Sequence, residues 1–280
     1  MQGKVVVITG ATSGIGEIAA GRLAQQGARL LLIARDPHRA KATLARLNTI
    51  AADPGHRFYE ADLSRLSEMK RVAGEIAAAE PRIDVLINNA GAFFSHRRVS
   101  EDGLEMTFAL NHMSYFVLTC VLAERLKAAA PSRIVSTASG AHRRAHLDFD
   151  DLQTYREYDG YKAYGRSKLC NILFTRALAR RLDGTGVTAN CLHPGFVATR
   201  FGDQAGGWMS FAIRAAKLFA ISPDKGAETI VYLATSPEVA SKSGLYFYKN
   251  APDTPTADAQ DDAAAERLWA ESARIAKIDL

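Results

Sequence analysis

The sequence predicts an α/β fold in which a doubly wound, parallel sheet of about seven strands carries helices on both faces. Short β-branched or apolar runs alternate with longer segments of helical periodicity along nearly the whole chain, which is typical of repeated β-α-β units. A glycine-rich turn joins the first run, Val5 to Ile8, to the first helical segment, Glu17 to Gln26. Because 280 residues are enough for one sizeable core, we expect a single domain over residues 1–280.

The individual elements follow from the points where the hydrophobic period changes. Residues 141–160 are polar and charged without a clear period, so we expect an insertion or loop there. Strands are expected near 5–8, 30–34, 57–60, 84–87, 133–137, 187–192 and 245–248, and helices near 17–26, 37–51, 66–79, 106–129, 164–182, 223–235 and 258–277.

The turn after the first strand reads Thr9-Gly10-Ala11-Thr12-Ser13-Gly14-Ile15-Gly16. Glycines at this place allow a tight turn and let a pyrophosphate approach backbone N–H groups at the helix N-terminus, where the helix dipole favours an anion. The alternative is a plain structural turn. Its position between a strand and a helix favours dinucleotide binding, with candidate contacts Gly10, Thr12, Ser13, Gly14, Ile15 and Gly16.

Arg35 follows the second strand at the place where an NAD-preferring site usually has a carboxylate for the ribose 2′-hydroxyl. An arginine can pair bidentately with a 2′-phosphate, so this strand end favours NADP(H) over NAD(H). Asp36 leaves an alternative open, because its carboxylate could pair with Arg35 or reach the ribose itself. Arg35 could also be a solvated charge.

Small and polar residues follow the third and fourth strands. Asp62-Leu63 comes after the third, and Asn88-Asn89-Ala90-Gly91 comes after the fourth. Ligands of open α/β sheets bind at the carboxyl ends of the strands. Turn formation alone would explain the Asn and Gly residues, and Asp62 could be a helix N-cap. The candidate cofactor contacts here are Asp62, Leu63, Asn89, Ala90 and Gly91.

Two polar residues occur in otherwise apolar surroundings near this edge. Asn111 lies among apolar residues of the 106–129 helix, so its amide must find structural or functional hydrogen-bond partners. Ser139 follows the fifth strand, again at the expected ligand-binding edge.

Tyr164 and Lys168 are four residues apart on an expected helix and therefore project from one face. A nearby cation favours the phenolate, so we expect Lys168 to lower the pKa of Tyr164 towards the range useful for proton transfer. Tyr158 and Lys162 have the same spacing, but Gly160 lies between them and weakens a helix there. We therefore expect Tyr164 and Lys168 to form the functional pair.

The sixth strand leads into a turn, His193-Pro194-Gly195-Phe196-Val197-Ala198-Thr199, at the same edge. Behind Gly206-Gly207, the stretch to Ala220 contains six large apolar side chains. It predicts a flap over residues 200–222 that would favour an apolar substrate. The alternative is a small, statically packed extra helix.

Composition excludes several other classes of protein. The 35 basic and 30 acidic side chains are interspersed and give a net charge of +5, so nucleic-acid binding gains little support. Three widely spaced cysteines, Cys120, Cys170 and Cys191, form neither a disulfide framework nor a zinc pattern, which fits the reducing cytoplasm and predicts no metal. We expect a soluble protein without a signal peptide or membrane span.

Together, the motifs resemble the short-chain dehydrogenase/reductase family over residues 4–250. Within that family the chain looks most like the retinol dehydrogenase branch and its bacterial relatives, which have a similar insert before the tyrosine helix; light-dependent protochlorophyllide reductases are a looser match. The resemblance to the family is carried by Thr9-Gly10-x-x-x-Gly14-x-Gly16, Asn88-Asn89-Ala90-Gly91, Asn111, Ser139, Tyr164-x-x-x-Lys168 and Pro194-Gly195. The branch is indicated by Arg35-Asp36, Asn111-His112, Ser167-Lys168-Leu169-x-Asn171-Ile172-Leu173-Phe174 and His193-Pro194-Gly195.

The resemblance implies a Rossmann fold and roles for the catalytic residues. Tyr164 would exchange a proton with a carbonyl or alcohol oxygen, and Ser139, rather than the competing Ser136, would hydrogen-bond the same oxygen. Lys168 would hold the nicotinamide ribose as well as tune the tyrosine, and Asn111 would support a water that connects the lysine to solvent. Thr199 matches a position that contacts the nicotinamide carboxamide, and further cofactor contacts are expected at Tyr164, Lys168, Pro194, Gly195 and Val197.

The function implied by the resemblance is hydride transfer between NADP(H) and a carbonyl or alcohol, on a lipophilic small molecule. Two alternatives remain open: a C=C reductase that uses the same acid, and a non-catalytic NADP-binding sensor. The intact set of Asn111, Ser139, Tyr164 and Lys168 favours the enzyme. A homodimer or homotetramer is usual in the family.

Overall fold

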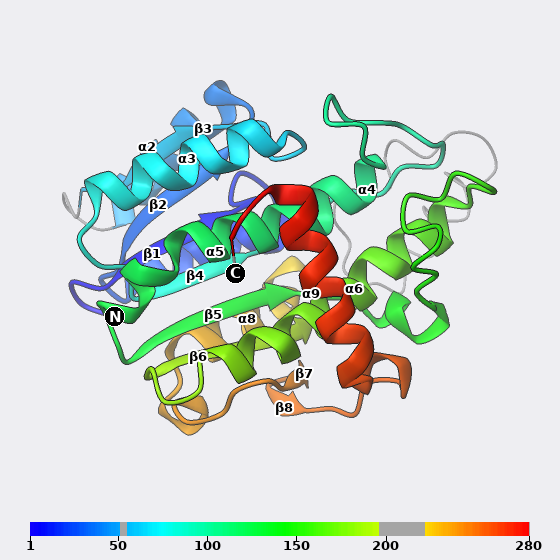
Figure 1. The fold of residues 1–280 in the computed structure, drawn as a ribbon. Coiled ribbons are helices and arrows are strands. Elements are labelled where there is room, and N and C mark those ends of the chain that lie inside the picture. The colour runs from blue at the N-terminus through cyan, green and yellow to red at the C-terminus, as the bar shows by residue number, and fades with distance from the viewer. Residues whose placement is uncertain (51–54, 196–221, 280) are drawn as a thin grey trace.

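The structure is a computed structural model of the 280-residue chain, and it describes residues 1–50, 55–195 and 222–279. An eight-stranded sheet forms its centre, with the strand order β3-β2-β1-β4-β5-β6-β7-β8 (Figure 1). The strands are β1 (Val5–Thr9), β2 (Arg29–Ala34), β3 (Arg57–Glu60), β4 (Val85–Asn88), β5 (Ser132–Thr137), β6 (Val187–His193), β7 (Tyr246–Tyr248) and β8 (Ala251–Pro252).

The first seven strands pair in parallel, which confirms the predicted doubly wound α/β fold. The eighth strand, β8, pairs antiparallel with β7 and was not predicted. Its two residues, Ala251 and Pro252, are too few to give a period, and proline is typical of an edge strand.

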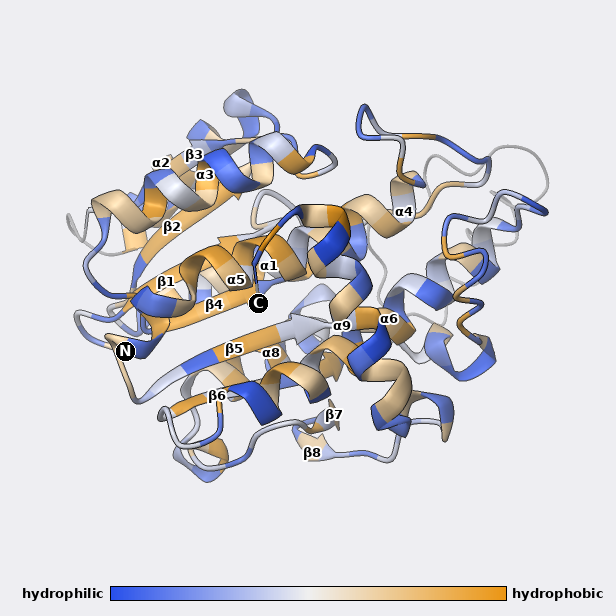
Figure 2. Ribbon diagram, in the orientation of Figure 1, coloured by the Kyte–Doolittle hydropathy of each residue, from blue (hydrophilic) through white to orange (hydrophobic). Residues whose placement is uncertain are grey.

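Helices cover both faces of the sheet, because alternate side chains of each strand point to opposite sides. Val5 and Val7 of β1 belong to the core beneath α3, α5, α6 and α9, whereas Val6 and Ile8 belong to the core beneath α1, α2 and α8. Figure 2 shows β1 and β4 as apolar, as expected for strands buried on both faces. The helices are α1 (Gly14–Gln25), α2 (Pro37–Ile50), α3 (Leu66–Ala79), α4 (Met106–Phe108), α5 (Ser114–Lys127), α6 (Gly160–Arg181), α8 (Pro223–Thr235) and α9 (Asp262–Ala276).

The helix expected over 106–129 is interrupted by a π-helical segment at Ala109–Met113, between α4 and α5. Such bulges are often found at functional sites, and this one contains Asn111. Met106–Lys127 is long and apolar enough to cross a membrane, but most of it is buried in the protein. A core helix has the same composition, so this feature does not indicate a membrane span.

The segment before the tyrosine helix is largely irregular, as predicted. A 3-10 helix at Gly140–Arg144 is followed by residues without helix or strand up to the start of α6. Helix α6 begins at Gly160 rather than at Tyr164, and the Asp159 side chain caps it by accepting hydrogen bonds from Tyr161 N at 2.8 Å and Lys162 N at 3.0 Å. Tyr158 therefore precedes the helix and does not share a helical face with Lys162.

The expected helix over 258–277 is divided into a short 3-10 helix at Asp258–Gln260 and α9. Most of the predicted flap over 200–222 lies outside the described residues, and so does its apolar stretch from Gly206 to Ala220. Ser222, which is described, caps α8 through a hydrogen bond from Lys225 N at 3.4 Å.

Candidate active site

Tyr164 and Lys168 lie on one face of α6, next to the carboxyl end of β5. Lys168 is only 3% exposed, and its Nζ donates a hydrogen bond to the Thr137 carbonyl at 2.8 Å. The same nitrogen lies 5.7 Å from the centre of the Tyr164 ring and 5.5 Å from the centre of the Tyr115 ring. The lysine is thus fixed at the end of β5, between two phenol rings.

Ser139 joins this pair from the loop after β5. Its Oγ accepts a hydrogen bond from Ala141 N at 3.2 Å, and its hydroxyl also forms a hydrogen bond with Tyr164. The competing serine, Ser136, is buried within β5 and lies in register with Asn88 and Cys191 of the neighbouring strands. The hydroxyl that meets Tyr164 is therefore that of Ser139.

The acid–base properties of the pair differ from our expectation. Burial raises the pKa of Tyr164 to about 12, and the hydrogen bond from Ser139 offsets this only in part. Burial also lowers the pKa of Lys168 to about 7. The prediction that Lys168 lowers the pKa of Tyr164 was wrong for this state of the protein. Desolvation disfavours the charged form of both groups, and Lys168 is not among the groups that shift the pKa of Tyr164.

Asn111 connects α6 to the loop after β4. Its Oδ1 accepts from Ala92 N at 2.8 Å, and its Nδ2 donates to Ala92 O and to Ser167 Oγ, both at 3.0 Å. Ser167 in turn donates to the Tyr164 carbonyl at 2.7 Å. The Asn111 side chain therefore holds the backbone beside Tyr164 and Lys168, since both of its amide protons are used by protein groups, and the expected support of a water by Asn111 stays a prediction.

The glycine-rich turn has the shape that a pyrophosphate requires. Gly10 and Gly14 have φ values of +68° and +58°, which favour glycine. A Cβ on Gly16 would lie 2.4 Å from both Asn89 Nδ2 and the Gly10 carbonyl, so only glycine fits. Ser13 is the N-cap residue of α1 and makes no side-chain hydrogen bond to it. The N–H groups of the first turn therefore face the sheet edge without a side-chain cap, where an anion would be stabilised.

Asn89 ties three strand ends together around this turn. Its Nδ2 donates to the carbonyls of Thr9 and Gly10 at 3.1 and 3.3 Å, and its Oδ1 accepts from Thr137 Oγ1 at 3.3 Å. Thr9 Oγ1 also accepts from the backbone N–H groups of Asn89 and Ala90. Because its side chain is occupied in this way, a cofactor contact by Asn89 would come from its backbone.

The Asp36 carboxylate, just after β2, is hydrogen-bonded to the backbone of α2. Its Oδ1 accepts hydrogen bonds from His38 N and Arg39 N at 2.9 and 3.2 Å, so the carboxylate caps the start of α2 and does not pair with Arg35. Arg35 is exposed. A second cation, Arg39, donates from Nη2 to the Thr12 carbonyl at 3.0 Å and so lies over the glycine-rich turn. This arginine was missed in the sequence, although it lies in the first turn of α2, four residues after Arg35.

The remaining predicted contacts lie at the same edge. Asp62 Oδ1 accepts from the Ser64 backbone and hydroxyl at 3.0 and 2.8 Å, whereas Arg65 is the N-cap residue of α3, so Asp62 shapes the preceding turn. The Leu63 side chain is buried in the core, which leaves its backbone for ligand contact.

Gly91 packs against Asn111 and Lys168, and Gly195 has a φ of +89°. Ile15, Ala90 and Pro194 are partly buried at this edge, and Val197 and Thr199 lie outside the described residues.

Two aromatic residues beside Tyr164 were also missed. The Phe93 ring packs edge-on against Tyr164 and Tyr161, with centroid distances of 6.2 and 5.4 Å. Tyr161 is 55% exposed and lies one helical turn before Tyr164. Its spacing on α6 was a usable signal, whereas the approach of Phe93 depends on the tertiary fold.

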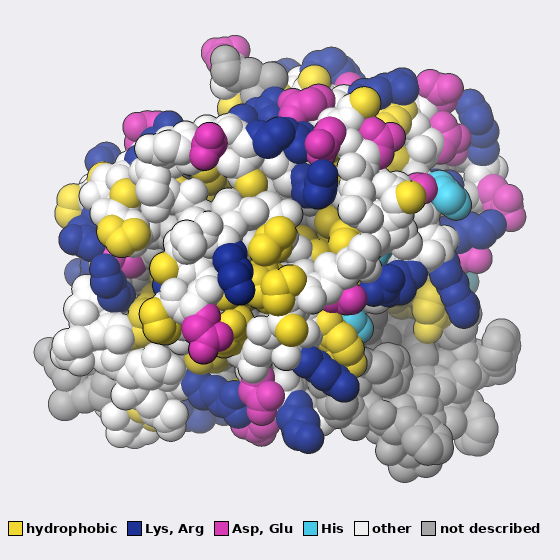
Figure 3. Space-filling model, turned by 90° about the horizontal axis from the view of Figure 1, so that it is seen from below, with side chains coloured by type: hydrophobic (Ala, Val, Ile, Leu, Met, Phe, Trp, Pro, Cys, Tyr) yellow, Lys and Arg dark blue, Asp and Glu magenta, His cyan; other side chains and the backbone are white. Residues whose placement is uncertain are grey.

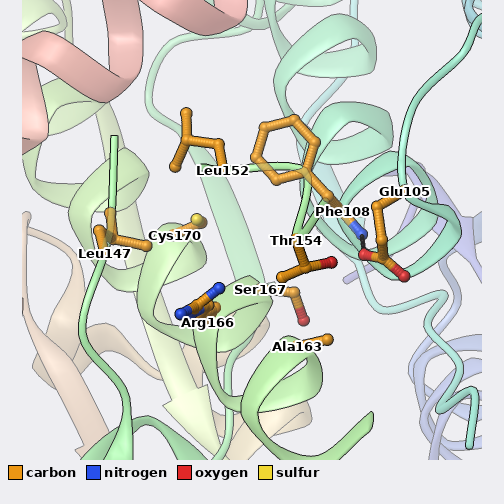
Figure 4. A pocket seen from close by; sticks show the side chains of 9 residues that line it. All are labelled: Glu105, Phe108, Leu147, Leu152, Thr154, Ala163, Arg166, Ser167 and Cys170. Carbon is orange, nitrogen blue, oxygen red and sulfur yellow. Dashed lines mark hydrogen bonds between the residues drawn. The ribbon is translucent and has the colours of Figure 1, made fainter. Parts of the chain in front are cut away.

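A small cavity of about 10 Å³ lies on another face of α6 (Figure 4). This is room for about one water molecule. It is enclosed between α6, the irregular segment and the start of α4, and it does not include Tyr164 or Lys168. Its lining residues are Glu105, Phe108, Leu147, Leu152, Thr154, Ala163, Arg166, Ser167 and Cys170.

The site geometry agrees with comparisons to known proteins. Residues 4–209 match the family described as short chain dehydrogenase. The chain belongs to the short-chain dehydrogenase/reductase family. Members of this family are oxidoreductases that bind a nicotinamide cofactor, and the glycine-rich turn and the Ser139, Tyr164 and Lys168 cluster of this dehydrogenase/reductase fit such a cofactor.

Among its relatives are retinol dehydrogenases, as the sequence predicted. It is 40% identical to human retinol dehydrogenase 13, over 99% of this chain and 86% of that protein. It is also 40% identical to mouse retinol dehydrogenase 14, over 96% of this chain and 84% of that protein.

Solved structures of similar fold cover most of this short-chain dehydrogenase/reductase. An uncharacterized protein from Mycobacterium paratuberculosis gives a TM-score of 0.79 at 30% identity, over 100% of this chain and 96% of that chain. A short chain dehydrogenase from Burkholderia cenocepacia in complex with NADP gives a TM-score of 0.70 at 28% identity, over 89% of this chain and 99% of that chain.

Proposed function

We propose that this protein is an NADP(H)-dependent oxidoreductase that interconverts a carbonyl and an alcohol on a lipophilic small molecule. The observation that carries the proposal is the meeting of two hydroxyl groups, those of Ser139 and Tyr164, with a buried Lys168 at the carboxyl edge of the sheet. The bound nicotinamide would supply or accept the hydride. The protein itself has to bind the substrate oxygen and move one proton.

The two hydroxyls divide this work. The Ser139 hydroxyl, which is bonded to Tyr164 in this structure, would turn its proton to the substrate oxygen and stabilise the charge that develops there. With a pKa of about 12, the Tyr164 phenol is protonated at neutral pH and can give its proton to a carbonyl oxygen. Lys168, with a pKa of about 7, can lose or regain a proton near neutral pH. The reductive direction uses these protonation states directly.

The preference for NADP(H) is supported by the two exposed arginines at the end of β2. Arg39 lies over the glycine-rich turn, and Arg35 has no competing bond to Asp36, because that carboxylate caps α2. A 2′-phosphate would find two cations there, beside a carboxylate whose Oδ1 is already bonded to the start of α2. A solved relative with NADP bound is in line with this preference.

A lipophilic substrate is supported by the aromatic wall of Phe93 and Tyr161 beside Tyr164. An apolar flap over residues 200–222 remains part of the proposal from sequence. The names of the relatives, retinol dehydrogenases, agree with an apolar alcohol or aldehyde.

We propose a single-domain protein of the cytoplasm, with a homodimer or homotetramer as its assembly. Cys170 and Cys191 are buried and Cys120 is half-buried, and burial raises the pKa of each thiol to about 12. Such thiols are unreactive, which suits a reducing compartment. On the face shown in Figure 3, basic and acidic side chains are interspersed, as on a surface without a nucleic-acid footprint.

The test is consumption of NADPH with a panel of aldehydes, ketones, quinones and enones, in wild type and in Tyr164→Phe. We expect reduction of an apolar carbonyl by wild type and no turnover by Tyr164→Phe, which keeps the ring but loses the proton. Cofactor binding, measured by nicotinamide fluorescence, should be unchanged. Tyr158→Phe is the matched control and should remain active, because Tyr158 hydrogen-bonds to the Phe94 carbonyl outside the site.

Turnover by Tyr164→Phe at the wild-type rate would contradict the proposed role of the phenol. Reduction of enones only would identify a C=C reductase, and NADPH binding without turnover of any substrate would identify a sensor.

A further inference from the structure

Two histidines hold the peptide group that follows Ser139. His142 Nδ1 lies 2.7 Å from the Ser139 carbonyl, which can only accept, so this nitrogen carries a proton and donates it. On the other side of the same peptide, Gly140 N donates to His193 Nδ1 at 3.1 Å. The C=O and the N–H of the Ser139–Gly140 peptide are therefore each bound by an imidazole.

His193 also reaches the turn that follows β6. Its Nδ1 accepts a second hydrogen bond, from Gly195 N at 3.2 Å, so one nitrogen joins the Ser139 loop to the Pro194–Gly195 turn. The last backbone bond between these chain segments is Ala138 N to Leu192 O at 2.8 Å. The His193 side chain continues this connection beyond the end of the sheet ladder.

The surroundings fix both the place and the protonation state of the His193 ring. The ring stacks on Tyr248 of β7 with a centroid distance of 4.9 Å, and a Cβ on Gly140 would lie 3.2 Å from His193 Nε2. Burial, together with the nearby His142 and Arg143, lowers the pKa of His193 to about 4, although Asp253 acts in the opposite direction. The ring is therefore neutral at working pH, and the single lone pair of Nδ1 is shared by the N–H groups of Gly140 and Gly195.

We infer that His193 is a positioning residue that sets the Ser139 hydroxyl relative to Tyr164 and to the Pro194–Gly195 turn. This inference rests on the proposed function, because it assigns the histidine a task in that reaction. The ring bonds the N–H of the Ser139–Gly140 peptide and not the Ser139 hydroxyl, so it acts through the backbone. The property of His193 that matters for the reaction is therefore the hydrogen-bond acceptor at its Nδ1.

Two substitutions separate the acceptor from the bulk of the ring. His193→Asn keeps an oxygen near the δ1 position, whereas His193→Leu fills similar space without an acceptor. We expect kcat to fall by about tenfold to a hundredfold in His193→Leu, because a small displacement of a catalytic group has effects of this size. We expect His193→Asn to keep most of the activity and the wild-type KM for NADPH, whereas His193→Leu should also raise that KM, because it releases the Pro194–Gly195 turn that is expected to contact the cofactor. The control is His146→Leu, an exposed histidine with 85% of its side chain accessible, which should be silent.

A double-mutant cycle with Ser139→Ala distinguishes this inference from the proposed function. If His193 acts through Ser139, adding His193→Leu to Ser139→Ala should cost little further activity. Hydrogen exchange of the Gly140 and Gly195 amides, which needs no turnover, should accelerate in His193→Leu and not in His193→Asn.

Equal losses in the Asn and Leu variants, or fully additive losses with Ser139→Ala, would overturn the inference while leaving the proposed reaction intact. Wild-type activity in Ser139→Ala or in Tyr164→Phe would instead overturn the proposed reaction.

Discussion

The proposed preference for NADP(H) depends on how Asp36 and Arg39 are held near the end of β2. The carboxylate of Asp36 is used by the N–H groups of His38 and Arg39, as is common for aspartate at a helix start. Within the described residues Arg35 forms no ion pair with Asp36, and Arg39 is held over the turn by the Thr12 carbonyl.

Replacing either arginine should weaken NADPH use selectively. We expect Arg35→Ala to raise the KM for NADPH by about tenfold or more, since a charge-assisted hydrogen bond contributes about 1.5–3 kcal/mol. Arg39→Ala should act in the same direction, and the KM for NADH should stay nearly constant in both. Asp36→Asn is the control, because asparagine caps a helix equally well. A marked gain in NADPH preference in Asp36→Asn would show that the carboxylate faces the ribose after all.

Lys168 should make the stability of the protein depend on pH. Its pKa is about 7 in the folded protein and near 10.5 when unfolded, so between these values the unfolded chain binds more protons and stability rises with pH. Lys168→Met removes this dependence. Relative to the variant, the wild type should therefore gain up to about 5 kcal/mol of unfolding free energy as pH rises through this window. Urea denaturation of both proteins checks this, and a constant difference between them would contradict the lowered pKa.

At the scale of an element, the Asn111 side chain joins the π-helical segment between α4 and α5 to the loop after β4. Asn111 is fully buried, and its amide pairs with both backbone groups of Ala92. The pairing resembles one rung of a sheet ladder made by a side chain, and it sets the distance between α6 and the loop after β4.

Asn111→Ala should cost about 2–4 kcal/mol of unfolding free energy, because it leaves two backbone groups and Ser167 with one partner fewer in a buried place. Urea denaturation gives the value directly. Asn48→Ala, at an exposed position of α2, is the matched control and should change stability by less than about 0.5 kcal/mol. A stability loss no larger than that of the control would mean that water replaces the amide without difficulty.

At the scale of the whole molecule, the C-terminal helix α9 covers the layer formed by α5 and α6. Trp269 of α9 stacks on Phe174 of α6 at 5.8 Å and meets Phe116 of α5 edge-on at 5.0 Å. At the rim, Arg176, Arg180 and Arg181 of α6 pair with Asp262 and Glu266 of α9. The exposed ion pairs contribute little, so the aromatic cluster carries most of the docking energy.

Trp269→Ala should lower the unfolding free energy by about 3–5 kcal/mol, as is usual for truncation of a large buried aromatic residue. Trp269→Phe should cost much less, because the indole Nε1 makes no hydrogen bond to the part of the chain that the structure describes. Thermal and urea unfolding of the two variants provide the comparison. Similar losses in both would point to a water-mediated bond at the indole nitrogen.

The sequence predicted those elements whose pattern of apolar residues lies within the element itself, and it missed those that have no such pattern of their own. The strands and most helices were predicted within a few residues, because burial on both faces produces continuous apolar runs and periodic helices. The π-helical segment was missed, since Ala109–Met113 keeps the apolar composition of a regular helix. Strand β8 was missed because its only signal is its pairing with β7.

The sequence alone determined the fold class, the family and the identities of Ser139, Tyr164 and Lys168 as candidates, because spacing and position after a strand are local properties of the chain. The tertiary structure decided the rest. In the folded protein the Asp36 carboxylate accepts hydrogen bonds at the start of α2, and the Asn111 amide bonds the backbone of Ala92. The Ser139–Gly140 peptide is hydrogen-bonded by His142 and His193. The tertiary structure also reversed the expected pKa of Tyr164, because desolvation depends on everything packed around a group and no spacing in the sequence records it.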